Sequence, residues 1–488
     1  MDPIILICII LAYFGILLII SLFTSKNVNN EGFFVGNRKS YWFIVAFGML
    51  GSSISGVTFI SVPGWVQTTQ MTYMQMVLGF VLGYITIAYV LLPIYYKLKL
   101  PSIYTYLEQR FGNYSYKTGA SFFLLSRLIG SAFRLYIVAN VLQIIIFDQL
   151  SIPFGITVLI TLGFIWLYTF RGGIKTIIWT DTLQTLFMFI ALIATILIIA
   201  KDLNFGFIDT VSAIYHNPMS KMFEFSDWHS TQHFVKQFIS GAFITIVMTG
   251  LDQDMMQKNL SCRSLKDAKK NMLSYGIAFL PANLLFLSLG VLLMIYAQKY
   301  GIDPELIKGD NLYPYLATNL LGSVVLIFFI VGLMASAYSS ADSALTALTT
   351  SFTVDILGIK GKSESQVKKT RKITHIGMSL VLGLIIILFH VINEKSVIDA
   401  IYTIAGYTYG PLLGLYALGL FTKVKLKEKF VPIVAISSPI LCIIINYILI
   451  NFVGYKMGYE LLLLNGLLTF LGLLIIKSKP DIRVNIIK

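Results

Sequence analysis

Charged residues are scarce in this 488-residue chain. Asp, Glu, Lys and Arg together make up 12% of it, about half the share of an ordinary soluble protein. Hydrophobic residues make up 57%, and the mean hydropathy is +0.79. Apolar runs of roughly 18 or more residues, long enough to cross a bilayer as a helix, recur from end to end. This pattern excludes a soluble globular protein and the short alternating segments of a transmembrane β-barrel, and it predicts an all-α membrane protein.

Cysteine and histidine are also rare. The three cysteines lie apart, with Cys8 and Cys442 in apolar runs and Cys262 in a basic loop, so we interpret them as packed or free thiols rather than a disulfide framework. The five histidines lack the spacing of metal ligands. A phosphate-binding GxxxxGK[ST] loop is absent as well, which argues against an ATP-driven pump. We therefore expect a protein that is not an enzyme.

The apolar runs predict thirteen transmembrane spans in one transmembrane domain over residues 1–488. They cover approximately residues 3–23, 42–66, 74–96, 118–147, 153–170, 176–200, 234–256, 271–297, 319–351, 373–394, 396–421, 430–454 and 459–476. The first run lacks the basic start and the small-residue cleavage site of a signal peptide, so we expect it to be a retained span. The tail after residue 476 is too short for a signalling domain, which disfavours a transport-like sensor.

Most of the 37 basic residues lie in alternate connecting segments, such as 258–270, 360–372 and 423–429. The positive-inside rule assigns these segments to the cytoplasm, with the N-terminus outside and the C-terminus inside a cell (inner) membrane. The net charge of +14 is then a signal of topology and of contact with the anionic lipid bilayer. We accordingly expect no nucleic-acid partner, and nothing in the sequence indicates an obligate protein partner.

Ionisable side chains inside spans are expensive, so each is a functional candidate. The predicted spans contain Arg127, Arg134, Asp181 and Asp342, whereas Asp252, Asp254 and Asp355 fall near cytoplasmic span ends, where we expect water to be close. Arg134, near the middle of its span, needs an anion. That anion is either Asp342 or Asp181 in an internal ion pair, or the carboxylate of a substrate, which a guanidinium matches bidentately.

The span at 319–351 carries a row of hydroxyl groups. Ser336, Ser339, Ser340 and Ser343 follow the spacing i, i+3, i+4, i+7, which places them on one helical face, and Asp342 adjoins that face. Hydroxyl oxygens beside a carboxylate suit a hard cation such as sodium. The alternative is a face of small residues that lets helices pack closely.

The span at 42–66 contains the segment GSSISGVT at 51–58, followed by Pro63 and Gly64. Two glycines that flank three serines make a poor continuous helix. An unwound stretch exposes carbonyl oxygens, and broken helices of this kind form the binding sites of secondary transporters. The alternative is a glycine-rich packing seam with a proline kink.

Four stretches together resemble the sodium/solute symporter family, which includes bacterial sodium/sialic acid, sodium/proline and sodium/galactose symporters. They are GSSISGVTFISVPG (51–64), RGGIKTIIWTDTLQ (171–184), LDQDMMQKNLS (251–261) and ASAYSSADSALTALTTSFTVDIL (335–357). The resemblance implies a leucine-transporter-like fold with two inverted five-helix repeats, at 42–200 and 234–421, each opened by a broken helix. Residues 1–41 would add one span and a loop, and 422–488 two spans and a tail.

The resemblance also implies a sodium site. Its ligands would be the carbonyls of Gly51 and Ile54 with oxygens of Ser336, Ser339 and Ser340. Asp181, in the WTD motif, would lie on the sodium exit path or form a second sodium site with Ser339, Ser340 and Ser343. Asp342 stands where the sialic acid symporter pattern has serine, so it would either strengthen the second site or pair with an arginine.

Positions that contact substrate in the sialic acid symporter pattern correspond to Ser53, Ser55 and Thr58, with Arg134 close to its carboxylate-binding arginine. The substrate glutamine of that pattern aligns with Val77, and Gln75 lies two residues away. We predict a sodium-coupled symporter that imports a small organic solute by alternating access, favouring a sugar acid such as sialic acid. The alternatives are a sugar, polyol or amino acid symporter, a channel or a sensor.

Overall fold

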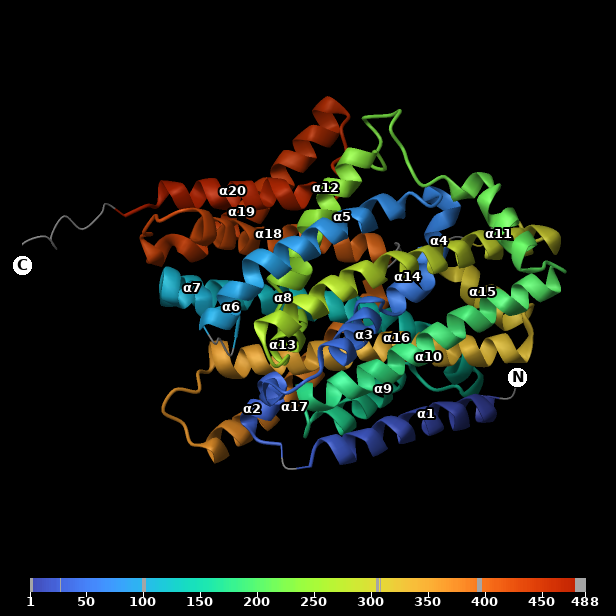
Figure 1. Ribbon diagram of the computed structural model, residues 1–488, viewed down its shortest axis with the longest axis horizontal. Coiled ribbons are helices and arrows are strands. Elements are labelled where there is room, and N and C mark those ends of the chain that lie inside the picture. Colours follow the sequence, from blue (N-terminus) through green and yellow to red (C-terminus); the bar gives the residue numbers. More distant parts are fainter. Residues whose placement is uncertain are drawn as a thin grey trace, which may run out of the picture.

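The computed structural model describes residues 3–26, 28–98, 102–303, 307, 309–392 and 397–478, without the side chains of Pro3 and of 392–400. Within these ranges the chain is helical, and its β-structure is limited to two isolated bridges, Ser40 with Cys262 and Leu426 with Lys477. The predicted cytoplasmic tail from residue 479 onward lies outside the described residues. The all-α prediction is confirmed for the described chain (Figure 1).

The α-helices are α1 (Pro3–Thr24), α2 (Asn30–Val35), α3 (Trp42–Ser53), α4 (Gly56–Thr69), α5 (Tyr73–Thr86), α6 (Leu92–Leu98), α7 (Thr105–Arg110), α8 (Asn113–Leu142), α9 (Phe154–Thr169), α10 (Ile174–Asp202), α11 (Phe207–Tyr215), α12 (Phe234–Thr245), α13 (Gln253–Leu260), α14 (Leu265–Lys299), α15 (Leu312–Asn319), α16 (Gly322–Ser351), α17 (Glu364–Ile392), α18 (Val397–Phe421), α19 (Val431–Ile448) and α20 (Leu461–Ile475). Single π-helical turns extend five of them, at Ile87–Leu91, Gln143–Phe147, Ile246–Gly250, Phe352–Ile356 and Leu449–Val453.

Most of the long helices run along the long axis of the molecule (Figure 1). In the described part of the chain, nine helices are long and apolar enough to cross a membrane, or up to eleven if each of two bent helix pairs is one span. The apolar helices α9 and α20 have 16 and 15 residues, shorter than a typical span. A multi-pass helical membrane protein is therefore confirmed, and the number thirteen stays a prediction.

Two spans are broken. Helices α3 and α4 meet at 57°, and the α12 segment meets α13 at 65°. The first break, Ile54–Ser55, falls inside the glycine- and serine-rich segment, where helix propensity is lowest. At the second break, Leu251–Asp252, the side chain of Asp252 accepts hydrogen bonds from the N–H groups of Asp254 and Met255 and caps α13. Both spans that we predicted to be broken are bent.

The core is built around α16. Every residue from Gly332 to Ser351 is buried, and α16 packs against α10, α8, α17, α4 and α3. Small side chains on α16 and the glycines of α3 and α4 allow this close approach. Helix α1 runs along one edge of the bundle, and α18, α19 and α20 gather at the opposite edge (Figure 1). The first break therefore lies deep inside the molecule, between α16 and α10.

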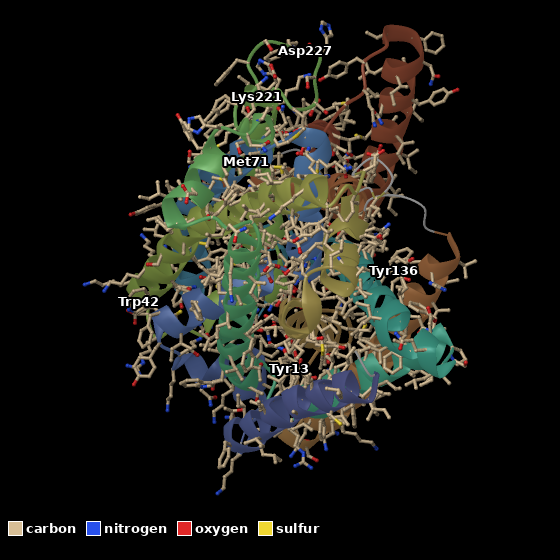
Figure 2. All side chains as sticks on the ribbon, turned by 90° about the vertical axis from the view of Figure 1, so that its right-hand side faces the viewer. Tyr13, Trp42, Met71, Tyr136, Lys221 and Asp227 are labelled. Carbon is tan, nitrogen blue, oxygen red and sulfur yellow. The ribbon has the colours of Figure 1, made fainter. Side chains whose placement is uncertain are left out.

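The end of the molecule that carries α11 is covered by the segment 203–233. Figure 2 looks onto this end, with Met71, Lys221 and Asp227 toward one edge, and the Met71 N–H donates to the Lys221 carbonyl at 3.1 Å. The apolar side chains of α11, Phe207, Ile208 and Tyr215, are exposed. An exposed apolar face on a short helix at the end of a bundle is typical of a helix at the membrane–water interface.

Candidate functional site

The first break leaves the backbone carbonyls of Gly51, Ser53 and Ile54 without a backbone N–H donor among the described residues. Ile54 has φ −78° and ψ 78°, so the helical ladder stops there, although its N–H still donates to Leu50 O at 3.0 Å. Among the described residues, no backbone N–H donates to the carbonyl of Gly51 or of Ile54. An unsatisfied carbonyl is costly at membrane depth, where water is scarce. These two oxygens therefore fit the chemistry of a sodium site.

The carbonyl of Ser52, between them, is held by α16. Ser340 Oγ donates to Ser52 O at 2.7 Å, which joins the hydroxyl row directly to the break. Gly51 lies on the other side against α10, where an added Cβ would stand 1.9 Å from Thr185 Oγ1. Only glycine permits this approach of the two helices. The structure thus brings Gly51, Ile54 and Ser340 into one buried region.

The hydroxyl row of α16 divides between three partners. Ser339 Oγ donates to Asp181 Oδ1 at 2.6 Å and Ser343 Oγ to Asp181 Oδ2 at 3.4 Å. Ser336 Oγ donates to Leu333 O of its own helix at 2.9 Å, which leaves its carbonyl as well as its hydroxyl available as a ligand. Two hydroxyls of the row, those of Ser339 and Ser343, therefore bond to Asp181, and the hydroxyl of Ser340 bonds to the first break.

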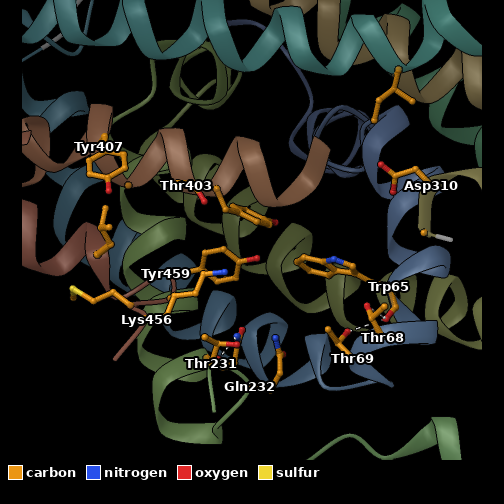
Figure 3. A pocket seen from close by; sticks show the side chains of 18 of the residues that line it. Trp65, Thr68, Thr69, Thr231, Gln232, Asp310, Thr403, Tyr407, Lys456 and Tyr459 are labelled. Atoms are coloured by element: carbon orange, nitrogen blue, oxygen red, sulfur yellow. Dashed lines mark hydrogen bonds between the residues drawn. The ribbon is translucent and has the colours of Figure 1, made fainter. Parts of the chain in front are cut away.

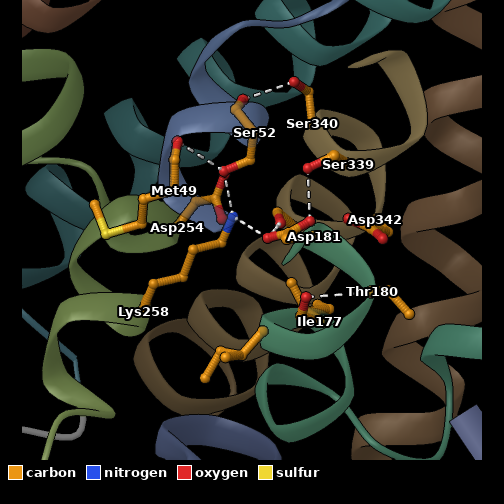
Figure 4. A network of polar contacts seen from close by, with 12 residues as sticks. Met49, Ser52, Ile177, Thr180, Asp181, Asp254, Lys258, Ser339, Ser340 and Asp342 are labelled. Atoms are coloured by element: carbon orange, nitrogen blue, oxygen red, sulfur yellow. Dashed lines mark hydrogen bonds and ion pairs between the residues drawn. The ribbon is translucent and has the colours of Figure 1, made fainter. Parts of the chain in front are cut away.

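Lys258 enters this cluster from α13. Its Nζ lies 2.7 Å from Asp181 Oδ2 and donates to Ser52 Oγ at 2.6 Å, as Figure 4 shows. Sequence reasoning missed this residue because it was counted among the basic residues of a cytoplasmic segment. The structure instead buries it, with 1% of the residue exposed. A lysine within the motif LDQDMMQKNLS, seven residues past a predicted helix break, was the available signal.

Asp342 pairs with no arginine among the described residues. Its Oδ2 accepts a hydrogen bond from the hydroxyl of Tyr168 at 2.8 Å, and the residue is fully buried. The internal ion pair between Arg134 and Asp342 or Asp181, which the sequence left open, is therefore not formed. Asp342 lies near the candidate sodium region (Figure 4), held by the tyrosine of α9.

The second break is fastened by Arg127 of α8. Arg127 forms an ion pair with Asp254 and lies 3.7 Å from Asp252, and Asp252 also accepts from Tyr409 OH at 2.6 Å. Asp355 is bonded to hydroxyls in the same way. All three carboxylates are 0% exposed, so the expectation that water lies close to them was wrong. Asp252 and Asp254 lie against Arg127 of α8, and Asp355 lies against Ser102 and Tyr116.

Arg134 lines a small cavity beside the first break. The cavity has a volume of about 90 Å³, and its lining includes Ser53, Ser55, Thr58, Tyr84, Arg127, Arg134, Tyr275 and Tyr402. Within the described residues, Arg134 has no carboxylate within 4 Å, and its Nε makes no hydrogen bond. Ser53 Oγ and Tyr84 OH each hydrogen-bond to Tyr275 OH, at 2.6 and 2.8 Å. The cavity thus combines one unpaired guanidinium with a hydroxyl-rich wall.

Gln75 lies outside the small cavity beside the first break. Its Nε2 donates to Gln232 O at 2.8 Å, and its Oε1 accepts from the N–H of Glu224 at 2.9 Å. These bonds hold the covering segment 203–233 against α5, and Gln75 is absent from the lining of the cavity. The expected contact between Gln75 and substrate is therefore not made in this structure, because the helical rotation of α5 turns this side chain toward the segment.

A wider cavity of about 780 Å³ opens outside the small one. Its lining includes Trp65, Tyr402, Lys456 and Tyr459, and Figure 3 shows Trp65, Lys456 and Tyr459 around the open space. Tyr402 belongs to the walls of both cavities, and its hydroxyl lies 3.1 Å from Tyr73 OH. A solute that entered from the outer cavity would therefore have to pass Tyr402 to reach Arg134.

Comparison with known protein families decides the identity. The model of the sodium:solute symporter family matches residues 33–428. The chain belongs to the sodium:solute symporter family. Because this is a family of sodium-coupled transporters, the predictions of sodium-coupled symport, of sodium as the coupling ion and of a protein that is not an enzyme are confirmed.

Individual relatives support the same family assignment, and solved structures show the same fold. The sodium/sialic acid symporter of Aliivibrio fischeri is 26% identical over 84% of this chain and 82% of its own. The sodium/sialic acid symporter of Proteus mirabilis is 26% identical over 85% of this chain and 84% of its own. Among solved structures, a Na⁺-coupled sialic acid symporter in a substrate-bound outward-open state has a TM-score of 0.81 at 21% identity, covering 96% of this chain and 97% of its own. A nucleobase-cation-symport-1 family transporter has a TM-score of 0.55 at 13% identity over 91% and 94%. Symporters thus share this fold beyond the family itself.

Proposed function

We propose that this symporter imports a small organic carboxylate, a sugar acid such as sialic acid, together with sodium by alternating access. The unpaired guanidinium of Arg134 in the small cavity beside the first break carries the proposal. A half-buried arginine inside a membrane protein, with no counter-ion among the described residues, is costly, so an anion is expected to bind there. A carboxylate suits it because guanidinium offers two parallel N–H donors.

Hydroxyl groups around Arg134 match the rest of such a solute. Ser53, Ser55 and Thr58 line the cavity from the break, and Tyr84 and Tyr275 line it opposite. These groups both donate and accept hydrogen bonds, as the hydroxyl and amide groups of a sugar acid require. Relatives over most of the chain are sodium/sialic acid symporters, which supports the same substrate class here.

A smaller carboxylate is the second candidate, because the cavity is small. Its volume of about 90 Å³ is below the roughly 300–1,000 Å³ of usual ligand pockets. Val77 stands where the sialic acid pattern has a substrate glutamine, and it lies outside the lining. A sodium-coupled monocarboxylate transporter of Mus musculus is 26% identical over 80% of this chain. A nine-carbon sugar acid would need Tyr402 to move so that both cavities join.

We propose that sodium is held by the carbonyls of Gly51 and Ile54 with Ser336, Ser339 and Ser340. These two carbonyls, which receive no backbone N–H of the described chain, and the bond from Ser340 to Ser52 O support this assignment. Substrate in the cavity and sodium at the break would stabilise the same conformations, so each would raise the affinity for the other. A membrane potential of 100 mV contributes about 2.3 kcal/mol for each sodium ion that enters, and a monovalent anion entering with it offsets that amount.

We place the protein in the inner membrane with thirteen spans, the N-terminus outside and the C-terminus in the cytoplasm. The first broken span would open one five-helix repeat, at 42–200, and the second broken span the other, at 234–421. The equivalent bends of 57° and 65° support this division. The basic segments 258–270, 360–372 and 423–429 support the orientation.

Uptake by proteoliposomes tests the function. Sialic acid, short monocarboxylates, neutral sugars and amino acids would be offered as labelled solutes, with an inward sodium gradient or with potassium in its place. We expect sodium-dependent uptake of a carboxylate and a loss of at least 100-fold in its apparent affinity in Arg134→Gln. Arg134→Lys keeps the positive charge but loses the two parallel N–H donors of the guanidinium. Its apparent affinity for the carboxylate should lie between those of wild type and Arg134→Gln. Sodium-independent uptake would contradict the coupling, and full affinity in Arg134→Gln would contradict the carboxylate site.

A further inference from the structure

We propose that the ammonium group of Lys258 occupies the second cation position at Asp181, so that the carrier binds one sodium ion and not two. This inference rests on the proposed sodium site at the first break. It assigns to Lys258 the role of a tethered cation that determines how many sodium ions are bound.

Lys258 binds the carboxylate that a second sodium ion would need. Its Nζ lies 2.7 Å from Asp181 Oδ2 and 2.6 Å from Ser52 Oγ. Ser339 Oγ and Ser343 Oγ donate to the two oxygens of the same carboxylate. Asp181 thus already receives one cation and two hydroxyl donors. The carboxylate that the sequence suggested for a second sodium site is already paired with a positive charge supplied by the chain itself.

Charge balance favours this arrangement over two ions. Asp181 and Lys258 are 0% and 1% exposed, so both have left water, and each needs the other to offset the cost of burial. A sodium ion on Asp181 would sit beside an ammonium group in a poorly screened interior, where like charges repel strongly. Sodium can therefore bind Asp181 only if the lysine charge is removed.

The main sodium region avoids this conflict. Ser340 donates to the carbonyl of Ser52 and not to Asp181, and Gly51 and Ile54 contribute neutral carbonyl oxygens. Ser339 is the proposed ligand that the two positions share, because its hydroxyl donates to Asp181. Lys258 stays beside this region through Ser52 Oγ, with its charge neutralised by Asp181. The first break and the Lys258–Asp181 pair are consequently neighbours with separate cation requirements, one met by sodium and one by the protein.

Direct binding of sodium-22 to the purified protein counts the ions without any substrate. We expect one ion per wild-type chain with a Hill coefficient near 1. Lys258→Met frees Asp181, and we expect two ions and a Hill coefficient above 1. Lys258→Met combined with Asp181→Asn removes both charges and should return the count to one, while Lys258→Arg keeps a tethered cation and should also give one.

Each result decides between the alternatives. Two ions on the wild-type chain, or one ion on a folded Lys258→Met chain, would overturn the inference. If Lys258→Met does not yield monodisperse protein, Asp181→Asn decides: the inference expects one ion, with half-saturation within threefold of wild type, whereas loss of a bound ion would overturn it. A wild-type chain that binds no sodium would instead refute the sodium site at the first break, which separates the two failures.

Discussion

The two helix breaks of this symporter bend by similar angles but satisfy their backbones differently. At the second break, Tyr95 OH donates to Gly250 O at 3.0 Å and Tyr104 OH to Leu251 O at 2.9 Å. At the first, the carbonyls of Gly51 and Ile54 receive no N–H from the described chain. Equivalent bends are therefore not equivalent sites. Because no backbone N–H of the described chain donates to Met248 O or Thr249 O at the second break either, the hydroxyl row and Asp181 beside the first break, rather than orphan carbonyls alone, favour a cation there.

The two helix breaks also differ in the charged groups that surround them. The second break holds two buried aspartates beside a single arginine, Arg127, and Asp252 is bonded further by Tyr409 OH and two backbone N–H groups. The first break holds only neutral oxygens on its backbone, with the unpaired Arg134 across the small cavity. One break is complete without a ligand, and the other offers sites for a cation and for an anion. Substitutions at the two breaks should consequently affect different properties.

The largest effect should come from removing the charge that fastens the second break. Arg127→Met leaves Asp252 and Asp254 buried without their cation, which costs about 3–5 kcal/mol of stability for a broken buried pair. Thermal unfolding in detergent should show a strongly lowered midpoint. Adding Asp254→Asn removes one of the unpaired charges and should restore part of the loss. A single variant as stable as wild type would mean that Arg127 does not hold this break.

A smaller effect is expected where glycine allows close packing at the first break. The Cβ of Gly51→Ala would stand 1.9 Å from Thr185 Oγ1 and 3.0 Å from Thr185 Cα. Relief of this clash should cost about 1–3 kcal/mol and move α3 away from α10, which disturbs the contact of Ser340 with Ser52 O and lowers sodium affinity. Thermal unfolding at increasing sodium concentrations measures both the loss of stability and the sodium affinity.

Gly250 provides the matched control at the second break. An added Cβ there meets only the flexible side chains of Leu91 and Ile87, at 2.5 and 2.8 Å. Gly250→Ala should therefore keep the sodium half-saturation within twofold of wild type. Equal losses of sodium affinity in the two variants would remove the distinction between the breaks.

The smallest effect should follow from Tyr104→Phe, which leaves the carbonyl of Leu251 without its hydroxyl donor. An orphaned buried acceptor costs about 1–3 kcal/mol, so the melting midpoint should fall slightly. Sodium affinity should not change, because this carbonyl belongs to the satisfied break. A sodium affinity that changed with stability unaltered would indicate that the second break also binds the ion.

Much of this architecture could be predicted from the sequence. Apolar length predicted the long spans, and glycine and serine content predicted the first break, because both depend on local composition. The hydroxyl row of α16 was also visible, since a helical period fixes its face. The partners of those hydroxyls were not, because Asp181 and Ser52 reach α16 only through the packing of three helices.

The errors share one cause, which is that a side chain's surroundings depend on distant segments. Lys258 looked like a cytoplasmic charge, yet the fold buries it against Asp181. Asp252 and Asp254 were expected near water, yet Arg127 encloses them. Gln75 was expected at the substrate, yet the segment 203–233 claims its amide. Periodicity assigns a residue to a face, but only tertiary structure determines what that face meets.

Sodium titration of Ser340→Ala tests the central claim most directly. Sodium-dependent thermal stabilisation, measured without substrate, would be compared in wild type, Ser340→Ala and Ser336→Ala. We predict that Ser340→Ala raises the sodium concentration for half-maximal stabilisation at least tenfold. Ser336→Ala retains its backbone carbonyl and should stay within about threefold if that carbonyl is the ligand. An unchanged half-saturation in Ser340→Ala would contradict a sodium site between α16 and the first break.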